Sequence, residues 1–151
     1  MARTAQARAL VALAPEAAMA LWQNASRWPA FVEGHARTIE VSPAWPAEGS
    51  KVVWESGSGG RGRVTERVVE RTGLRFATDV FEDSLNGRQT FRVGEHAEGS
   101  RVQLELEYEL TRGGPLRVVS DLLFIRRALR DSLSRTLRRF AVEAEDEAGL
   151  R

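Results

Sequence analysis

The chain has 151 residues, a length at which one ordinary domain can bury a core without disulfides. Its 22 basic and 21 acidic residues leave a net charge of +1, which argues against a phosphate-neutralising nucleic-acid binder, and 42% hydrophobic residues argue against disorder. Cysteine is absent and histidine occurs twice, so the composition excludes disulfides, thiolate nucleophiles and zinc–thiolate sites.

Neither a membrane span nor a signal peptide is predicted. No stretch approaches the roughly 18 uncharged apolar residues of a membrane helix. The apolar run near the N-terminus is interrupted by Arg8 and Pro15, unlike a signal peptide. We therefore expect a cytoplasmic protein with a single domain over residues 1–151. We expect no metal and no cofactor, no nucleic-acid partner, and little reason for membrane contact.

The first part of the chain predicts a strand and two short helices. Residues 5–13 have the character of a strand. Pro15 and Glu16 then suit the first turn of a helix, because proline needs no amide partner there and glutamate faces the positive helix end. After a break at 24–26, residues 28–34 predict a second short helix or turn that ends at Gly34.

The middle of the chain predicts an antiparallel sheet, because apolar and polar residues alternate with a period of two. Ile39 and Val41 begin this pattern. Glycine-containing breaks separate the later strands at 57–60, 72–73, 86–87 and 98–100. The strands after residue 50 are predicted at about 51–55, 62–70, 74–81, 88–93 and 101–110.

Residues 116–145 predict one long amphipathic helix. Its apolar residues recur every three or four positions and form one stripe: Leu122, Ile125, Leu129, Leu133, Leu137 and Phe140. Arginines crowd the other side: Arg126, Arg127, Arg130, Arg135, Arg138 and Arg139. That basic side is either a solvated face or a contact surface for an anionic membrane or an acidic partner.

The alternation also predicts how the strands pair. A hairpin around residues 94–100 pairs Val93 with Val102 and Phe91 with Leu104, so that both pairs fall on the apolar face. A three-residue loop at 71–73 closes the preceding hairpin. The pairs that follow from this loop and the next are Val68–Phe76, Glu66–Thr78, Val64–Val80, Phe76–Val93 and Thr78–Phe91.

Three polar side chains, those of Glu66, Thr78 and Gln89, fall on the apolar inner face in this arrangement. A buried carboxylate is costly unless it is paired or hydrogen-bonded, so an inward Glu66 is a candidate for a functional site. Two other arrangements stay open: a bulge that turns Glu66 outward, or a position at a wet end of the sheet.

Four segments of the chain resemble bacterial members of the START-like (SRPBCC) superfamily, which have the helix-grip fold and include polyketide cyclase/dehydrase-type proteins. These segments are the strand-to-helix turn at 14–22, the aromatic–proline helix at 26–32, the turn at 45–49 and the glycine-led strand start at 60–66. The resemblance implies an α+β fold in which a curved antiparallel sheet grips the C-terminal helix, with two short helices near the N-terminus.

The same resemblance implies a cavity between the sheet and the last helix, because a curved sheet closes poorly on a straight helix. An alternative is that the lining side chains pack solidly and leave no room for a ligand. The inward residues expected to bind a ligand are Trp54, Val64, Glu66, Val68, Phe76, Thr78, Val80, Gln89, Phe91, Leu104, Leu106, Tyr108, Leu122, Ile125, Leu129 and Leu133.

Three functions follow from these expectations. The first is a carrier of a small hydrophobic ligand of aromatic, polyketide-like or lipid type. The second is a cyclase/dehydratase-like enzyme, for which the resemblance suggests Glu66 as acid/base, Tyr108 as hydrogen-bond donor and His35 or Arg63 at the rim. The third is an interaction module that uses the basic side of the last helix. The sequence ranks the first two above the third, and does not choose between carrier and enzyme.

Overall fold

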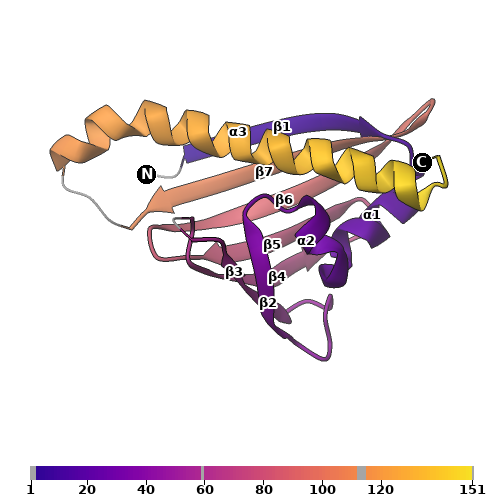
Figure 1. The fold of residues 1–151 in the computed structure, drawn as a ribbon, viewed down its shortest axis with the longest axis horizontal. Helices are drawn as coiled ribbons and strands as arrows, with labels where there is room; N and C mark the ends of the chain where they lie inside the picture. The colour runs from indigo at the N-terminus through magenta and orange to yellow at the C-terminus, as the bar shows by residue number, and fades with distance from the viewer. Residues whose placement is uncertain (1–2, 59, 112–114, 151) are drawn as a thin grey trace.

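The computed structural model describes residues 3–58, 60–111 and 115–150, with side chains from residue 123 onward in the last segment. A seven-stranded sheet and a long C-terminal helix dominate the described chain (Figure 1). The elements in chain order are β1 (Arg3–Val11), α1 (Pro15–Gln23), η1 (Ala25–Arg27), α2 (Trp28–Phe31), β2 (His35–Val41), β3 (Lys51–Ser56), β4 (Arg63–Arg71), β5 (Arg75–Phe81), β6 (Leu85–His96), β7 (Gly99–Leu110) and α3 (Pro115–Glu147).

The sheet is antiparallel throughout, with the strand order β1-β7-β6-β5-β4-β3-β2. It is curved and does not close, and α3 lies along its β1 side, where it packs mainly on β1 and also touches α2, α1 and β7 (Figure 1). The predicted α+β helix-grip architecture is therefore confirmed. None of the described helices is long and apolar enough to cross a bilayer.

The short helices begin at residues that favour a helix start. Pro15 opens α1 and Glu16 lies in its first turn, as predicted. The helix buries one side, which includes Leu21 and Trp22. The Asn24 side chain then caps η1, because its Oδ1 accepts a hydrogen bond from the Ser26 amide at 3.2 Å. The second helix is shorter than predicted, since α2 ends at Phe31.

The pairing predicted for the last hairpin is confirmed. Val93 faces Val102 and Phe91 faces Leu104 across β6 and β7. Along β7, buried residues alternate with exposed or half-buried ones, and Tyr108 lies on the buried side. The period of two therefore distinguishes the concave face of the sheet from its outer face.

The predicted pairing of β4, β5 and β6 is wrong by two residues. Glu66 faces Val80 rather than Thr78, and Phe76 faces Phe91 rather than Val93. For β4 and β5, one cause is a bulge after Val68, where the pairing of β4 with β5 shifts. The other is a tighter turn: the Thr72 amide donates to the Arg75 carbonyl at 2.8 Å, so the loop closes over residues 73–74. For β5 and β6, the Glu82 amide donates to the Leu85 carbonyl at 3.0 Å, so their turn closes over residues 83–84 and β6 begins earlier than predicted. A shift of two leaves the side chains of Glu66, Thr78 and Phe91 on their predicted faces.

Two further predictions of strand bounds also differ from the structure. The predicted break at 86–87 lies inside β6, which begins at Leu85 and places Gly87 opposite Tyr108 of β7. A Cβ atom on Gly87 would overlap the Glu107 carbonyl oxygen, so the glycine serves close strand approach rather than a turn. The first strand spans 3–11 instead of 5–13.

An aromatic core fills the end of the molecule where α1, α2 and the second half of α3 meet the sheet. Trp22 stacks on Phe91 with ring centroids 4.4 Å apart. Phe140 of α3 contacts Trp22, Phe31 and Phe91 edge-on at 5.1 to 5.6 Å. All four rings are at most 3% exposed. This end of the fold is therefore solid, and it anchors the second half of α3.

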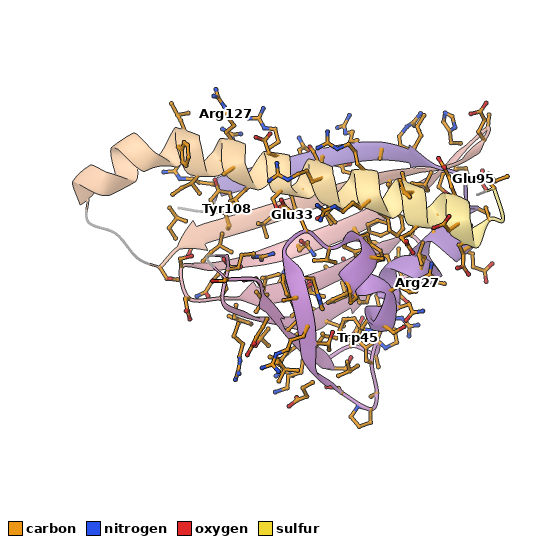
Figure 2. All side chains as sticks on the ribbon, viewed as in Figure 1. Arg27, Glu33, Trp45, Glu95, Tyr108 and Arg127 are labelled. Carbon is orange, nitrogen blue, oxygen red and sulfur yellow. The ribbon has the colours of Figure 1, made fainter. Side chains whose placement is uncertain are left out.

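Ion pairs hold the same half of α3 against the short helices. Arg27 binds Glu143 and Glu147 of α3, with both N–O distances at 2.8 Å. Arg135 of α3 binds Glu33, just after α2, at 2.5 Å. Figure 2 shows Arg27 and Glu33 next to α3. The sequence analysis did not predict these ion pairs. In each of them both partners lie outside the strands.

Candidate functional site

Glu66 lies on the concave face of the sheet at the centre of a buried polar cluster. Its side chain is 4% exposed. The Trp54 indole donates to Glu66 Oε2 at 2.9 Å, and the Thr78 hydroxyl donates to Oε1 at 3.0 Å. Gln89 Nε2 adds a longer contact to Oε1 at 3.5 Å. The predicted inward orientation of Glu66 is thus confirmed, and its carboxyl group is stabilised by donors from β3, β5 and β6.

Burial raises the pKa of the Glu66 carboxyl group above its usual value, while the Trp54 hydrogen bond, the positive charge of Arg61 and the Thr78 hydrogen bond oppose this rise. The cluster suits both protonation states. An ionised Glu66 accepts from all its donors, whereas a protonated Glu66 can donate to Thr78, whose hydroxyl oxygen also accepts. Glu66 can therefore gain or lose a proton without breaking the network.

Two side chains cover the Trp54 indole. The His35 ring stacks on it with centroids 5.0 Å apart, and the Arg61 guanidinium carbon lies 5.2 Å from the indole centroid. Arg61 also forms an ion pair with Glu82 at 2.5 Å, and the Glu82 side chain is 5% exposed. Arg61 thus links the β3–β4 loop to the β5–β6 turn above the Glu66 cluster.

His35 has one free ring nitrogen in this arrangement. Its Nε2 lies 3.1 Å from the Thr38 hydroxyl, but its Nδ1 is buried with no hydrogen-bond partner in the part of the chain that the structure describes. Burial lowers the pKa of His35, so the neutral ring is favoured. Arg63, the other predicted rim residue, does not join the cluster, because it is exposed and pairs with Glu55 at 3.0 Å.

Tyr108 supplies a second polar group to the concave face. Its side chain is 1% exposed, and its hydroxyl group has no hydrogen-bond partner among the described residues. Tyr108 lies in the same cross-strand row as Glu66: the row runs from Glu66 through Val80 and Gly87 to Tyr108. Figure 2 shows Tyr108 beneath the first half of α3, away from Trp45 and Arg27. An unpaired buried hydroxyl is uncommon and needs an explanation.

Most of the predicted ligand-binding residues share the concave face. Those of the sheet are at most 4% exposed, apart from the half-buried Gln89. On α3, Leu133 is buried and Ile125 and Leu129 are half-buried, whereas the Leu122 side chain lies outside the described residues. The buried sheet residues are Trp54, Val64, Glu66, Val68, Phe76, Thr78, Val80, Phe91, Leu104, Leu106 and Tyr108.

The predicted residues fall into two groups. Phe91 belongs to the aromatic core, where it contacts Trp22 and Phe140. The polar residues Glu66 and Tyr108 lie in a different cross-strand row of the sheet. Phe91 faces Leu104 on β7, and Tyr108 is four residues further along that strand. The candidate site is therefore the polar part of the concave face.

Sequence reasoning missed two members of this region, Arg61 and Glu82. Arg61 follows the glycine-containing break predicted at 57–60, and Glu82 precedes the β5–β6 turn. The opposite charges of Arg61 and Glu82 were the only sequence feature that could have indicated this ion pair. The two loops that carry them meet only in the folded sheet.

A surface hollow of about 570 Å³ lies elsewhere, between η1 and the turn after β2. Asn24, Val41 and Trp45 are among its lining residues, and the lining contains none of the predicted ligand-binding residues. We therefore place the candidate site at the Glu66 and Tyr108 row rather than at this hollow.

Comparisons with solved structures agree with the fold. The di-domain ARO/CYC StfQ from the steffimycin biosynthetic pathway is 16% identical, with a TM-score of 0.79 over 99% of this chain; the chain spans about half of that protein, 52% of its length. A Thermus thermophilus protein is 15% identical, with a TM-score of 0.77 over 96% of this chain and 99% of the other. These likenesses show the fold.

A plant enzyme has the same architecture. Norcoclaurine synthase from Thalictrum flavum, solved with a transition-state analogue, is 11% identical, with a TM-score of 0.72 over 98% of this chain and 97% of the other. No curated protein matches the sequence. One family model, described as polyketide cyclase / dehydrase and lipid transport, matches residues 2–145. Because that match covers almost the whole sequence, the chain belongs to the polyketide cyclase/dehydrase and lipid transport family.

Proposed function

We propose that this protein binds a small hydrophobic ligand between the concave face of the sheet and the first half of α3. The hydroxyl group of Tyr108, which has no partner in the described part of the chain, carries the proposal. Leaving such a group unpaired in the interior costs about 1–3 kcal/mol, and a ligand with one hydrogen-bonding group would remove that cost. An apolar surface with a few polar groups is also the usual form of a small-molecule site.

The exposure of the residues around Tyr108 suggests where the ligand body would lie. Ile125 and Leu129 belong to the inner stripe of α3 yet are only half-buried. Leu133, one turn further on, is 6% exposed. The inner stripe is thus incompletely covered at Ile125 and Leu129. An aromatic or aliphatic ligand lying there would cover Ile125 and Leu129 and place a polar group at Tyr108.

Two probes of similar size test this proposal: 2-naphthol, which has a hydroxyl group, and 2-methylnaphthalene, which has none. We expect both to bind by isothermal calorimetry, and 2-naphthol to bind roughly two- to tenfold more tightly through its hydrogen bond. Tyr108→Phe should abolish that preference. Glu109→Gln, an exposed change on the same strand, should preserve it.

The outcomes test the carrier function and the role of Tyr108 separately. Absence of binding by both probes, together with no small molecule retained by the purified protein in native mass spectrometry, would refute the carrier function. Binding with the same preference in Tyr108→Phe would instead refute the role of Tyr108.

A second candidate function is a cyclase/dehydratase-like reaction that uses Glu66 as acid and base. Its support is the Glu66 cluster, in which burial raises the pKa and Thr78 accommodates either protonation state. A substrate hydroxyl group would reach the carboxyl group most easily by displacing Gln89, which has the longest contact, 3.5 Å, and is half-buried.

Retro-aldol cleavage of a fluorogenic naphthyl β-hydroxyketone tests this candidate. Glu66 would take the hydroxyl proton as the carbon–carbon bond breaks, and would return it to the enolate, so the carboxylate is regenerated. We expect wild-type turnover above the buffer rate and a loss of about a hundredfold in Glu66→Gln. Glu109→Gln is the control. Equal rates in wild type and Glu66→Gln would leave the carrier as the function.

A further inference from the structure

The most exposed large apolar side chains of the described chain lie next to each other on α3. Leu123 is 79% exposed and Phe124 is 74% exposed. Single exposed apolar residues are common on protein surfaces, but adjacent ones on a helix form a patch that calls for a partner. Figure 1 shows that the first turns of α3 run past the ends of β1 and β7, so this part of the helix projects from the fold.

Exposed arginines follow this pair along the helix. Arg126, Arg127 and Arg130 form no ion pair with any described residue, in contrast to Arg135 one turn further on, which binds Glu33. Leu123, Arg127 and Arg130 are spaced by four and three residues and therefore share one side of the helix. Figure 2 shows Arg127 on the side of α3 that faces away from the sheet.

We propose that this surface, the α3 patch of Leu123, Phe124, Arg126, Arg127 and Arg130, docks the protein onto an anionic lipid surface. Leucine and phenylalanine side chains enter the boundary between headgroups and acyl chains, and arginines bind the lipid phosphates above it. The combination of exposed apolar and unpaired basic residues on one helix matches the two attractions that hold a peripheral helix at a membrane. This inference is independent of the ligand and of its site.

A lipid surface fits the α3 patch better than a second copy of the chain does. A two-fold contact would place each patch against itself, and its arginines would face arginines. The patch also belongs to a single helix, whereas a groove for a protein side chain is formed between two elements. A bilayer surface needs no such groove, because lipids adapt to the helix.

Vesicle flotation tests the proposal with the full chain. We expect the protein to float with vesicles in which about one third of the lipid is phosphatidylglycerol, and not with vesicles of phosphatidylcholine alone. Binding should fall as salt is added, because the arginine contribution is screened. Leu123→Ser/Phe124→Ser and Arg126→Glu/Arg130→Glu should each weaken binding on the order of tenfold or more.

Two matched double variants control for composition. Leu10→Ser/Leu74→Ser removes two other exposed leucines, and Arg8→Glu/Arg101→Glu makes the same change in net charge on the outer face of the sheet. We expect both to bind anionic vesicles within about twofold of wild type. Each variant is first checked for an unchanged thermal transition, so that misfolding is excluded.

Three results would overturn the proposal. The first is failure of the wild type to float with anionic vesicles. The second is an equal loss of binding in the patch and control variants, which would indicate a general charge effect. The third is a dimer in sedimentation velocity that Leu123→Ser/Phe124→Ser dissociates, which would assign the α3 patch to a second copy of the chain.

Discussion

At the scale of single residues, the Glu66 carboxyl group links stability to pH. Burial raises its pKa above the ordinary glutamate value of 4.5, although Trp54, Arg61 and Thr78 oppose the rise. The folded protein therefore keeps this proton to a higher pH than the unfolded chain does. The resulting stabilisation is complete below about pH 4.5 and is lost as the pH rises through the folded-state pKa.

We therefore expect wild type to lose urea resistance relative to Glu66→Gln as the pH rises from about 4 to about 8. Urea midpoints measured across this range check the prediction, and the difference between the two proteins isolates Glu66 from the other titrating groups. Glu109→Gln, at an exposed position, should follow the wild-type curve. A difference between wild type and Glu66→Gln that stays constant with pH would contradict a raised pKa.

Thr78 stabilises the ionised form of Glu66, because its hydroxyl group donates a hydrogen bond to Oε1 at 3.0 Å. Thr78→Val removes the hydroxyl group at nearly constant volume and leaves Oε1 of Glu66 with the 3.5 Å contact from Gln89. We expect it to destabilise the fold by about 1–3 kcal/mol and to steepen the loss of stability with rising pH. Thr78→Ser keeps the hydroxyl group and should keep the wild-type slope. Equal slopes in the two variants would show that the hydroxyl group does not support the carboxylate.

At the scale of secondary-structure elements, Gly87 shows how closely β6 and β7 approach. A Cβ atom there would overlap the Glu107 carbonyl oxygen, whereas one at Gly94 of the same strand meets open space. We expect Gly87→Ala to cost about 1–3 kcal/mol, because backbone must move. Gly94→Ala should change stability by less than about 1 kcal/mol, in the stabilising direction. Thermal unfolding of the pair checks this, and equal transition temperatures would contradict it.

The sequence predicted the faces of the strands better than their partners. The inward orientation of Glu66 follows from alternation and survives a two-residue change of register, because side chains repeat with a period of two. The bulge after Val68 leaves no signature in the local pattern, so the shifted pairs could not be predicted. Gly87 was interpreted as a break for the same reason: its role depends on β7, which is distant in sequence.

The candidate site was predictable in part for a related reason. Glu66 and Tyr108 were predicted as inward polar residues from the pattern of their own strands. The contact of Arg61 with the Trp54 indole was not predicted, because Arg61 lies in one loop and forms its ion pair with Glu82 of another loop. Contacts between loops depend on the packed sheet and have no periodicity that a sequence pattern can reveal.

At the scale of the whole molecule, α3 has two halves with different support. Leu137 and Phe140 in its second half are at most 1% exposed, and Arg27 binds Glu143 there. In its first half, Ile125 and Leu129 are half-buried. Segments with few buried apolar contacts open at a lower free energy than segments that belong to the core. The proposed ligand would lie under the half of α3 with less support.

Hydrogen–deuterium exchange measured by mass spectrometry tests this division. We expect peptides from residues 123–131 to exchange at least about tenfold faster than those from 133–144, since the latter open only with the aromatic core. Saturating 2-naphthol should slow exchange in 123–131, because a bound ligand covers Ile125 and Leu129, and should change 133–144 little. Uniform exchange along α3 would contradict the division into halves, while unequal exchange that 2-naphthol leaves unchanged would contradict a ligand beneath the first half.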